Sequence, residues 1–158
     1  MEPTVRIASP TDAAAAAGLL HDFNSEFATP TPGPEVLQQR LRTMLERDDV
    51  IVLLAEEPPA AVALITFRPS LWDRGPTALL EELYVRPPLR GRGIGGALLE
   101  RSVSLARDRG SETFEINVDE GDVDAQRFYV AHGFADTEPG EQERAMYYWR
   151  RLDPSASK

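Results

Sequence analysis

Seven residues near the middle of the chain, Arg90–Gly96 (RGRGIGG), constrain its fold more than any other stretch. Four of them are glycines, and they lie between an apolar run at Leu79–Val85 and a helical pattern over Ile94–Arg109. In such a strand–turn–helix unit the backbone N–H groups can approach a ligand closely, because glycine has no Cβ. These groups also lie at the positive end of the helix dipole. The segment therefore predicts an α/β fold with a phosphate or pyrophosphate site at this turn.

Two arginines, Arg90 and Arg92, are interleaved with the glycines and add positive charge. A turn that merely packs tightly is the competing interpretation, but arginine suits an anion site better than a tight packing site. Three of the glycines also satisfy the dinucleotide pattern G-x-G-x-x-G: Gly91, Gly93 and Gly96. That pattern normally follows the first strand of its domain directly, whereas half of this chain precedes it. We therefore favour a pyrophosphate turn of a different fold.

The other apolar patterns predict an alternation of short strands and helices. We expect strands at Val5–Ala8, Val50–Ala55, Ala60–Phe67, Thr113–Val118 and Ala145–Leu152, and a short extended segment at Phe134–Thr137. We expect helices from the Ser9–Asp12 cap to the Thr29–Pro34 break, over Pro34–Arg47, and over Asp122–His132. The fold should be a mixed, twisted sheet of six or seven strands with about four helices, in one domain over residues 1–152. Residues 153–158 should form a short disordered tail.

The composition argues against several classes of function. The absence of cysteine removes disulfides, thiolate metal sites and a cysteine acyl-enzyme. A net charge of −9 disfavours nucleic acid as a partner. No apolar run approaches the ~20 residues that span a membrane, and no signal peptide pattern opens the chain. We therefore expect a cytoplasmic protein that binds no nucleic acid, membrane or metal, and that can form a homodimer.

The segment Leu80–Leu99 (LEELYVRPPLRGRGIGGALL) resembles the acetyl-CoA signature of the GNAT family of N-acetyltransferases. The core of that signature, R/Q-x-x-G-x-G/A, is matched by Arg90, Gly93 and Gly95. A second block matches downstream at Ala125–Tyr129, and Gly133-Phe134 follows it. Two ordered blocks are more specific than either alone. The resemblance covers nearly the whole chain, and it implies the family's mostly antiparallel sheet and acetyl-CoA as acyl donor.

The resemblance implies roles at the cofactor. The strand backbone would contact the pantetheine arm, and the turn would bind the pyrophosphate. The cofactor-binding residues implied are Leu83, Tyr84, Val85, Arg90, Gly91, Arg92, Gly93, Ile94, Gly95 and Gly96. Asp122 stands where the family often has asparagine, and an ionised aspartate cannot donate a hydrogen bond, so its contact with the cofactor is an open question. Tyr129 would protonate the departing thiolate, unless it is only a core aromatic beside Phe128.

The acceptor amine must be neutral before it attacks a thioester, so a base is required. Glu81 matches the position of the base in the polyamine-acetylating branch of the family. Glu81 and Glu82 are consecutive, and on an ideal strand they would point to opposite faces, so at most one would face a cleft. Two solvated strand residues are the alternative. Candidates for acceptor binding are Glu82, Glu26, Phe27 and Trp72.

These residues together predict direct transfer of an acetyl group from acetyl-CoA to a primary amine of a small, cationic acceptor. Arginines gather at the turn while acids crowd the residues that follow, over Glu112–Asp124, and this asymmetry favours an approaching ammonium ion. One alternative is a protein acceptor, through a lysine or an N-terminal amine. Another, of a different class, is a non-catalytic acyl-CoA sensor or binding module on the same scaffold.

Overall fold

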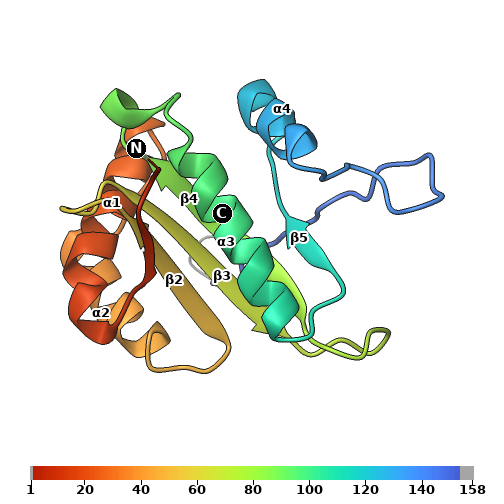
Figure 1. The fold of residues 1–158 in the computed structure, drawn as a ribbon, viewed down its shortest axis with the longest axis horizontal. Helices are drawn as coiled ribbons and strands as arrows, with labels where there is room; N and C mark the ends of the chain where they lie inside the picture. The colour runs from red at the N-terminus through yellow and green to blue at the C-terminus, as the bar shows by residue number, and fades with distance from the viewer. Residues whose placement is uncertain (1, 154–158) are drawn as a thin grey trace. The chain divides into compact units, whose positions relative to one another are not determined.

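The computed structural model describes residues 2–153, which belong to two compact units. The first unit runs to Ile116 and carries the whole sheet together with three α-helices (Figure 1). The second unit begins at Asn117 and carries helix α4 (Val123–Ala131). One domain over residues 1–152 stays a prediction, and residues 154–158 of the expected tail lie outside the described part of the chain.

The sheet of the first unit has five strands in the order β1-β2-β3-β4-β5 (Figure 1). They are β1 (Val5–Ile7), β2 (Val50–Ala55), β3 (Ala61–Arg68), β4 (Thr77–Val85) and β5 (Phe114–Ile116). Neighbours from β1 to β4 are antiparallel, and only β4 and β5 are parallel. The predicted α/β class with a mixed, mostly antiparallel sheet is therefore confirmed.

The predicted count of six or seven strands is wrong, because residues 145–152 form no strand in the structure. The expected extended segment at Phe134–Thr137 contributes only an isolated bridge between Thr137 and Arg144. Aromatic residues raise β-propensity, but a strand also needs a partner and a face to bury. Here Tyr148 and Trp149 are 83% and 75% exposed, so neither condition is met in this segment.

Helices cover both faces of the sheet (Figure 1). Helices α1 (Ala13–Glu26) and α2 (Pro34–Met44) pack on one face, where Val52, Val62, Leu64 and Tyr84 join their buried residues in one core. Helix α3 (Ile94–Asp108) packs against β2, β3 and β4 and buries its apolar side completely at Leu98 and Leu99. With α4 in the second unit, the prediction of about four helices is confirmed.

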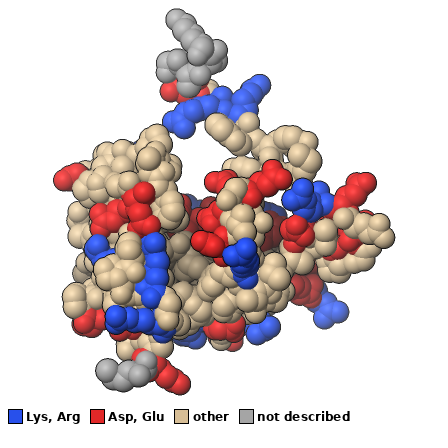
Figure 2. All heavy atoms as spheres, turned by 90° about the horizontal axis from the view of Figure 1, so that it is seen from above, with Lys and Arg blue, Asp and Glu red and all other residues tan. Residues whose placement is uncertain are grey.

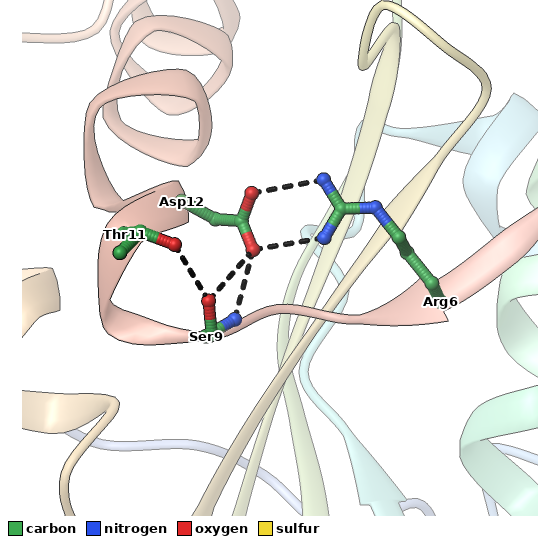
Figure 3. Close-up of polar contacts among 4 residues, drawn as sticks. All are labelled: Arg6, Ser9, Thr11 and Asp12. Carbon is green, nitrogen blue, oxygen red and sulfur yellow. Dashed lines mark hydrogen bonds and ion pairs between the residues drawn. The ribbon is translucent and has the colours of Figure 1, made fainter.

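The predicted cap at the start of the first helix is confirmed (Figure 3). The Ser9 amide donates to the Asp12 carboxylate at 2.9 Å, and a short 3₁₀ turn over Pro10–Asp12 leads into α1. Both terminal nitrogens of Arg6 also donate to this carboxylate at 2.8 Å. The Arg6 guanidinium and the Ser9 amide hold the pKa of Asp12 far below its usual range. This contact ties β1 to the entry of α1.

Candidate functional site

The glycine-rich segment forms the strand–turn–helix unit that its sequence predicts. Strand β4 ends at Val85, a 3₁₀ turn follows over Pro87–Leu89, and α3 begins at Ile94. Gly91 and Gly93 have φ angles of +76° and +82°, in the left-handed region where a side chain is strained. A Cβ built at either position would have no atom of the protein within 4 Å. Both glycines therefore border open space.

The backbone amides of this turn are available to an anion. The amides of Gly91, Arg92 and Gly93 donate no hydrogen bond within residues 2–153. Gly93 is the N-cap of α3, and it has no side chain that could accept hydrogen bonds from the first amides of the helix. The first amides of an α-helix have no acceptor within the helix itself. The turn thus offers consecutive N–H donors at a positive helix end, which fits a pyrophosphate.

Strands β4 and β5 pair only over a short stretch, at the end of β4 that lies away from this turn. Their register joins Ala78–Leu80 to Phe114–Ile116, and β4 continues beyond it to Val85. In the described residues no strand pairs with the β5-side edge of Leu83–Val85. An open edge presents backbone donors and acceptors to an extended polar ligand. The three predicted strand residues therefore adjoin the turn and keep such an edge.

A β-bulge places Glu81 and Glu82 on the same face of the sheet. Leu64 pairs with Glu82 and the next residue of β3 pairs with Leu80, so Glu81 is an extra residue in β4. Paired residues share a face, and so do residues two apart within a strand. Glu82 therefore lies on the face of Leu64, and Glu81 lies there too, beside Thr66. The expectation that the two carboxylates point to opposite faces is wrong, because a bulge interrupts the alternation.

The two carboxylates differ in their surroundings. Glu81 is exposed, and its Oε1 accepts a hydrogen bond from the Thr66 hydroxyl at 2.8 Å. Glu82 is only partly exposed, and among the described residues its side chain has no hydrogen-bond partner. Burial raises the pKa of the Glu82 carboxyl above its ordinary value, and the charge of Glu81 raises it further. The sheet face that packs against α1 and α2 thus holds two neighbouring carboxylates, and Glu82 is the one whose pKa is raised.

A second acidic group on this face is tied to the cofactor turn. Glu26, the last residue of α1, receives two contacts from Arg90 at 2.8 and 2.9 Å, and the Tyr84 hydroxyl donates to it at 3.0 Å. The bonds from Arg90, more than that from Tyr84, lower the pKa of Glu26. One turn earlier, Asp22 pairs with Arg86 at 2.8 Å. Ion pairs therefore fasten the end of α1 to both sides of Pro87–Leu89.

These ion pairs change the charge distribution that the sequence suggests. Two of the three arginines near the turn, Arg86 and Arg90, have carboxylate partners, whereas Arg92 forms no ion pair with any described residue. Acidic and basic side chains are also intermingled over the face shown in Figure 2. The positive field at the turn thus comes from the helix dipole and Arg92 more than from a free arginine cluster.

The remaining acceptor candidates of the first unit are placed differently. Phe27 follows Glu26, is 58% exposed, and meets the Phe23 ring edge-on at 5.6 Å. Trp72 is 89% exposed and belongs to the loop that precedes β4, at the opposite end of that strand from the turn. The structure therefore brings Glu26, Phe27, Glu81 and Glu82 to the α1 side of the sheet and leaves Trp72 apart. A role for Trp72 in acceptor binding stays a prediction.

Asp122 and Tyr129 belong to the second unit. Asp122 caps α4 by accepting a hydrogen bond from the Ala125 amide at 3.0 Å, as its position in the sequence predicts. Tyr129 is partly buried, and its ring meets those of Phe128 and Phe134 edge-on at 5.2 and 6.1 Å. The ring thus packs as a core aromatic does, which is compatible with a working hydroxyl. The catalytic role of Tyr129 and the cofactor contact of Asp122 stay predictions.

Three partners of the site were not assigned from the sequence: Asp22, Arg86 as its ion-pair partner, and Thr66. The four-residue spacing of Asp22 and Glu26 does place both acids on one side of a helix, and this was the available signal. Within residues 2–153, no group of three or more His, Cys, Asp or Glu side chains could hold a metal ion. No helix in that range is long and apolar enough to cross a membrane.

Comparison with known proteins decides the family. The acetyltransferase (GNAT) family profile matches residues 17–134, which include β2–β5, the glycine-rich turn and α4. This chain belongs to the GNAT family. Among curated relatives, aminoglycoside N(6')-acetyltransferase type 1 of Stenotrophomonas maltophilia is 29% identical over 98% of this chain and 97% of its own length. Aminoalkylphosphonate N-acetyltransferase of Salmonella typhimurium is 40% identical over a shorter stretch, 35% of this chain and 36% of its own length.

Solved structures agree with this family. A protein of Arthrobacter sp. FB24 described as an acetyltransferase is 53% identical, with a TM-score of 0.89 over 96% of this chain and 97% of its own. AAC(6')-Iy, solved with the bisubstrate analogue CoA-S-monomethyl-acetylneamine, has the same fold at 19% identity, with a TM-score of 0.77 over 96% of this chain and 99% of its own. The chain is thus an acetyl-CoA-dependent N-acetyltransferase of the GNAT family.

Proposed function

We propose that this GNAT enzyme transfers the acetyl group of acetyl-CoA directly to a primary amine of a small, cationic acceptor. The observation that carries the proposal is the bulge in β4, which places Glu81 and Glu82 together on the face that also carries Glu26. Such a face attracts an ammonium ion and can accept its proton. The names of two relatives, which acetylate an aminoglycoside and an aminoalkylphosphonate, support a small amine acceptor.

The chain's own residues would hold acetyl-CoA along a path that runs from the glycine-rich turn to strand β4. The free amides of Gly91–Gly93 and the first turn of α3 would bind the pyrophosphate, with charge from Arg92. The open edge of Leu83–Val85 would hydrogen-bond the pantetheine arm. When bound, acetyl-CoA supplies the thioester that is attacked. This arrangement leads from the turn along β4 towards the carboxylate pair.

In this proposal the two glutamates divide the work on the acceptor. Glu82 takes the proton from the incoming ammonium, because its raised pKa brings it nearer to the amine. Glu81, whose carboxylate accepts a hydrogen bond from Thr66, attracts the cation, and Glu26 and Phe27 lie at the edge of the acceptor site. The sequence alone favours Glu81 as the base. Single substitutions of Glu81 and of Glu82 distinguish which of them takes the proton.

Proton transfer on the other side of the reaction is assigned to Tyr129. As the acceptor nitrogen forms its bond to the acetyl carbon, the carbon–sulfur bond breaks and the phenol protonates the departing sulfur. The nitrogen gives up its extra proton to solvent, and the phenolate regains a proton from solvent. The chain has no cysteine to carry the acetyl group, so the amine attacks the bound donor within a ternary complex. A cytoplasmic location and a homodimer stay predictions from the sequence.

An acceptor screen tests the proposed function. Free thiol release from acetyl-CoA is followed with polyamines, aminoglycosides, amino acids, aminoalkylphosphonates and peptides as acceptors. We expect the highest kcat/KM with a small cationic amine. Raising the salt concentration should lower kcat/KM by screening the acidic face and leave kcat nearly constant. A peptide or a neutral molecule as the best acceptor would contradict the proposal, and binding of acetyl-CoA without turnover of any acceptor would favour a sensor.

The pH–rate profile separates the two glutamates. Glu82→Gln should lower kcat about tenfold near neutral pH, where the amine is protonated, and much less at alkaline pH, where the amine is already neutral. Glu81→Gln removes the same charge from the same face and serves as the matched control. It should raise the KM of the acceptor and leave the shape of the kcat profile unchanged. The reverse pattern would make Glu81 the base, and two unchanged profiles would assign the proton to water.

A further inference from the structure

Arg90, the first residue of the family motif, has a partner for each guanidinium nitrogen. Nη1 and Nη2 contact the two oxygens of Glu26 at 2.8 and 2.9 Å, and Nε donates to the Val85 carbonyl at 2.9 Å. The guanidinium also lies 5.5 Å from the centre of the Tyr84 ring. The Nη1–Nη2 edge of an arginine can form paired hydrogen bonds with one carboxylate or one phosphate at a time. In this structure Glu26 occupies the fork of Arg90.

Glu26 is held as firmly from its own side. Its carboxylate accepts from Arg90 and from the Tyr84 hydroxyl, and Tyr84 is stacked on Phe23 of α1 at 5.0 Å between ring centres. The Tyr84 side chain is only 5% exposed, so this anchor is part of the core. Glu26 is also the last residue of α1. The contact therefore joins the cofactor turn to the segment that carries Phe27.

A bound pyrophosphate would change these contacts. It would lie against the amides of Gly91–Gly93, immediately after Arg90, and it carries more negative charge than one carboxylate. Glu26 would then lose its cationic partner while keeping only the neutral Tyr84 hydroxyl. An ionised carboxylate in that position attracts another cation. The cation available on the shared face is the ammonium group of the acceptor.

We infer that Glu26 and the pyrophosphate of the cofactor compete for Arg90, so that cofactor binding releases Glu26 to receive the acceptor's ammonium group. The inference rests on the proposed function, and it names Glu26 as the residue that couples cofactor binding to acceptor binding. Glu26 thus favours a cationic acceptor only in the complex that is ready for transfer. In the free enzyme Glu26 also competes with the cofactor for Arg90, and the affinity for CoA measures this competition separately.

Isothermal titration with CoA tests the exchange. Glu26→Gln keeps the shape and one hydrogen-bond acceptor but removes the charge that competes for Arg90. We expect this variant to bind CoA about fivefold more tightly than the parent, the effect of losing one partly exposed bidentate ion pair. The matched control is Asp22→Asn, which removes the same charge from the same helix but frees Arg86 instead. It should bind CoA within about twofold of the parent, because a more distant charge is screened.

Acceptor binding should change in the opposite direction to CoA binding. With the best amine from the acceptor screen and saturating acetyl-CoA, Glu26→Gln should raise the KM of that amine, while Asp22→Asn should not. Tighter CoA binding combined with weaker acceptor binding supports the exchange. Equal or weaker CoA binding by Glu26→Gln, or equal tightening by both variants, overturns it. A parent that binds no CoA overturns the proposed function together with this inference, whereas a parent that binds CoA as tightly as Glu26→Gln overturns only the inference.

Discussion

Tyr129→Phe should lower kcat about 100-fold while leaving the affinity for CoA nearly unchanged. The substitution removes the phenolic hydroxyl, which we propose as the proton donor to the departing sulfur, and keeps the ring. The ring contacts with Phe128 and Phe134 at 5.2 and 6.1 Å should persist, so α4 should stay folded. A steady-state rate at saturating substrates and a CoA titration measure the two quantities separately.

Tyr147→Phe is the matched control, because it removes a hydroxyl from a tyrosine of the same unit that is 69% exposed. Its kcat should equal that of the parent. A Tyr129→Phe enzyme that turns over at the parental rate would show that water or another group protonates the sulfur. Tyr129 would then be a packing residue of the second unit. Loss of CoA affinity along with rate would instead indicate a structural defect in the variant.

The strand–turn–helix unit was predictable because every signal for it is local. Consecutive glycines, the prolines before them and the helical spacing after Ile94 all lie within one short segment. The same holds for the Ser9–Asp12 cap and for Asp122, whose side chains bond to amides three residues away. Interactions of this range depend on residue type and spacing, so the sequence specifies them directly.

The arrangement of the carboxylates was not predictable in the same way. Whether Glu81 is an extra residue in β4 depends on how β4 pairs with β3, and no local signal marks the bulge. The partners of Arg86 and Arg90 are likewise 64 residues away along the chain. A charge count showed three arginines near the turn, but it could not show that α1 neutralises two of them. These features appear only when the tertiary contacts are known.

The strand expected at Ala145–Leu152 illustrates a third kind of limit. Its aromatic residues have a high β-propensity, which means that they fit well on a half-buried sheet surface. Such a surface must be supplied by the rest of the fold. Met146 and Tyr147 are 74% and 69% exposed, so the segment has no such surface in the structure. By contrast, the apolar runs of β2 and β3 became strands because they pair with each other and are buried on both faces.

Gly93→Ala should weaken CoA binding about 100-fold, because an added Cβ borders the space in front of the free amides and the backbone must shift. Gly93 has a φ of +82° and no atom within 4 Å of an added Cβ, so the cost of the change in the free protein is backbone strain. Gly110, at the other end of α3, has the same φ of +82° and the same lack of neighbours. Gly110→Ala therefore carries equal strain away from the turn.

The thermal midpoint of these three proteins, with and without millimolar acetyl-CoA, tests the central claim most directly. A ligand that binds only the folded state raises the midpoint by mass action. We predict a clear rise for the parent and for Gly110→Ala, and no rise for Gly93→Ala, although both variants start from similarly lowered midpoints. No rise in the parent, or an equal rise in all three proteins, would contradict the claim that the Arg90–Gly96 turn holds the cofactor's pyrophosphate.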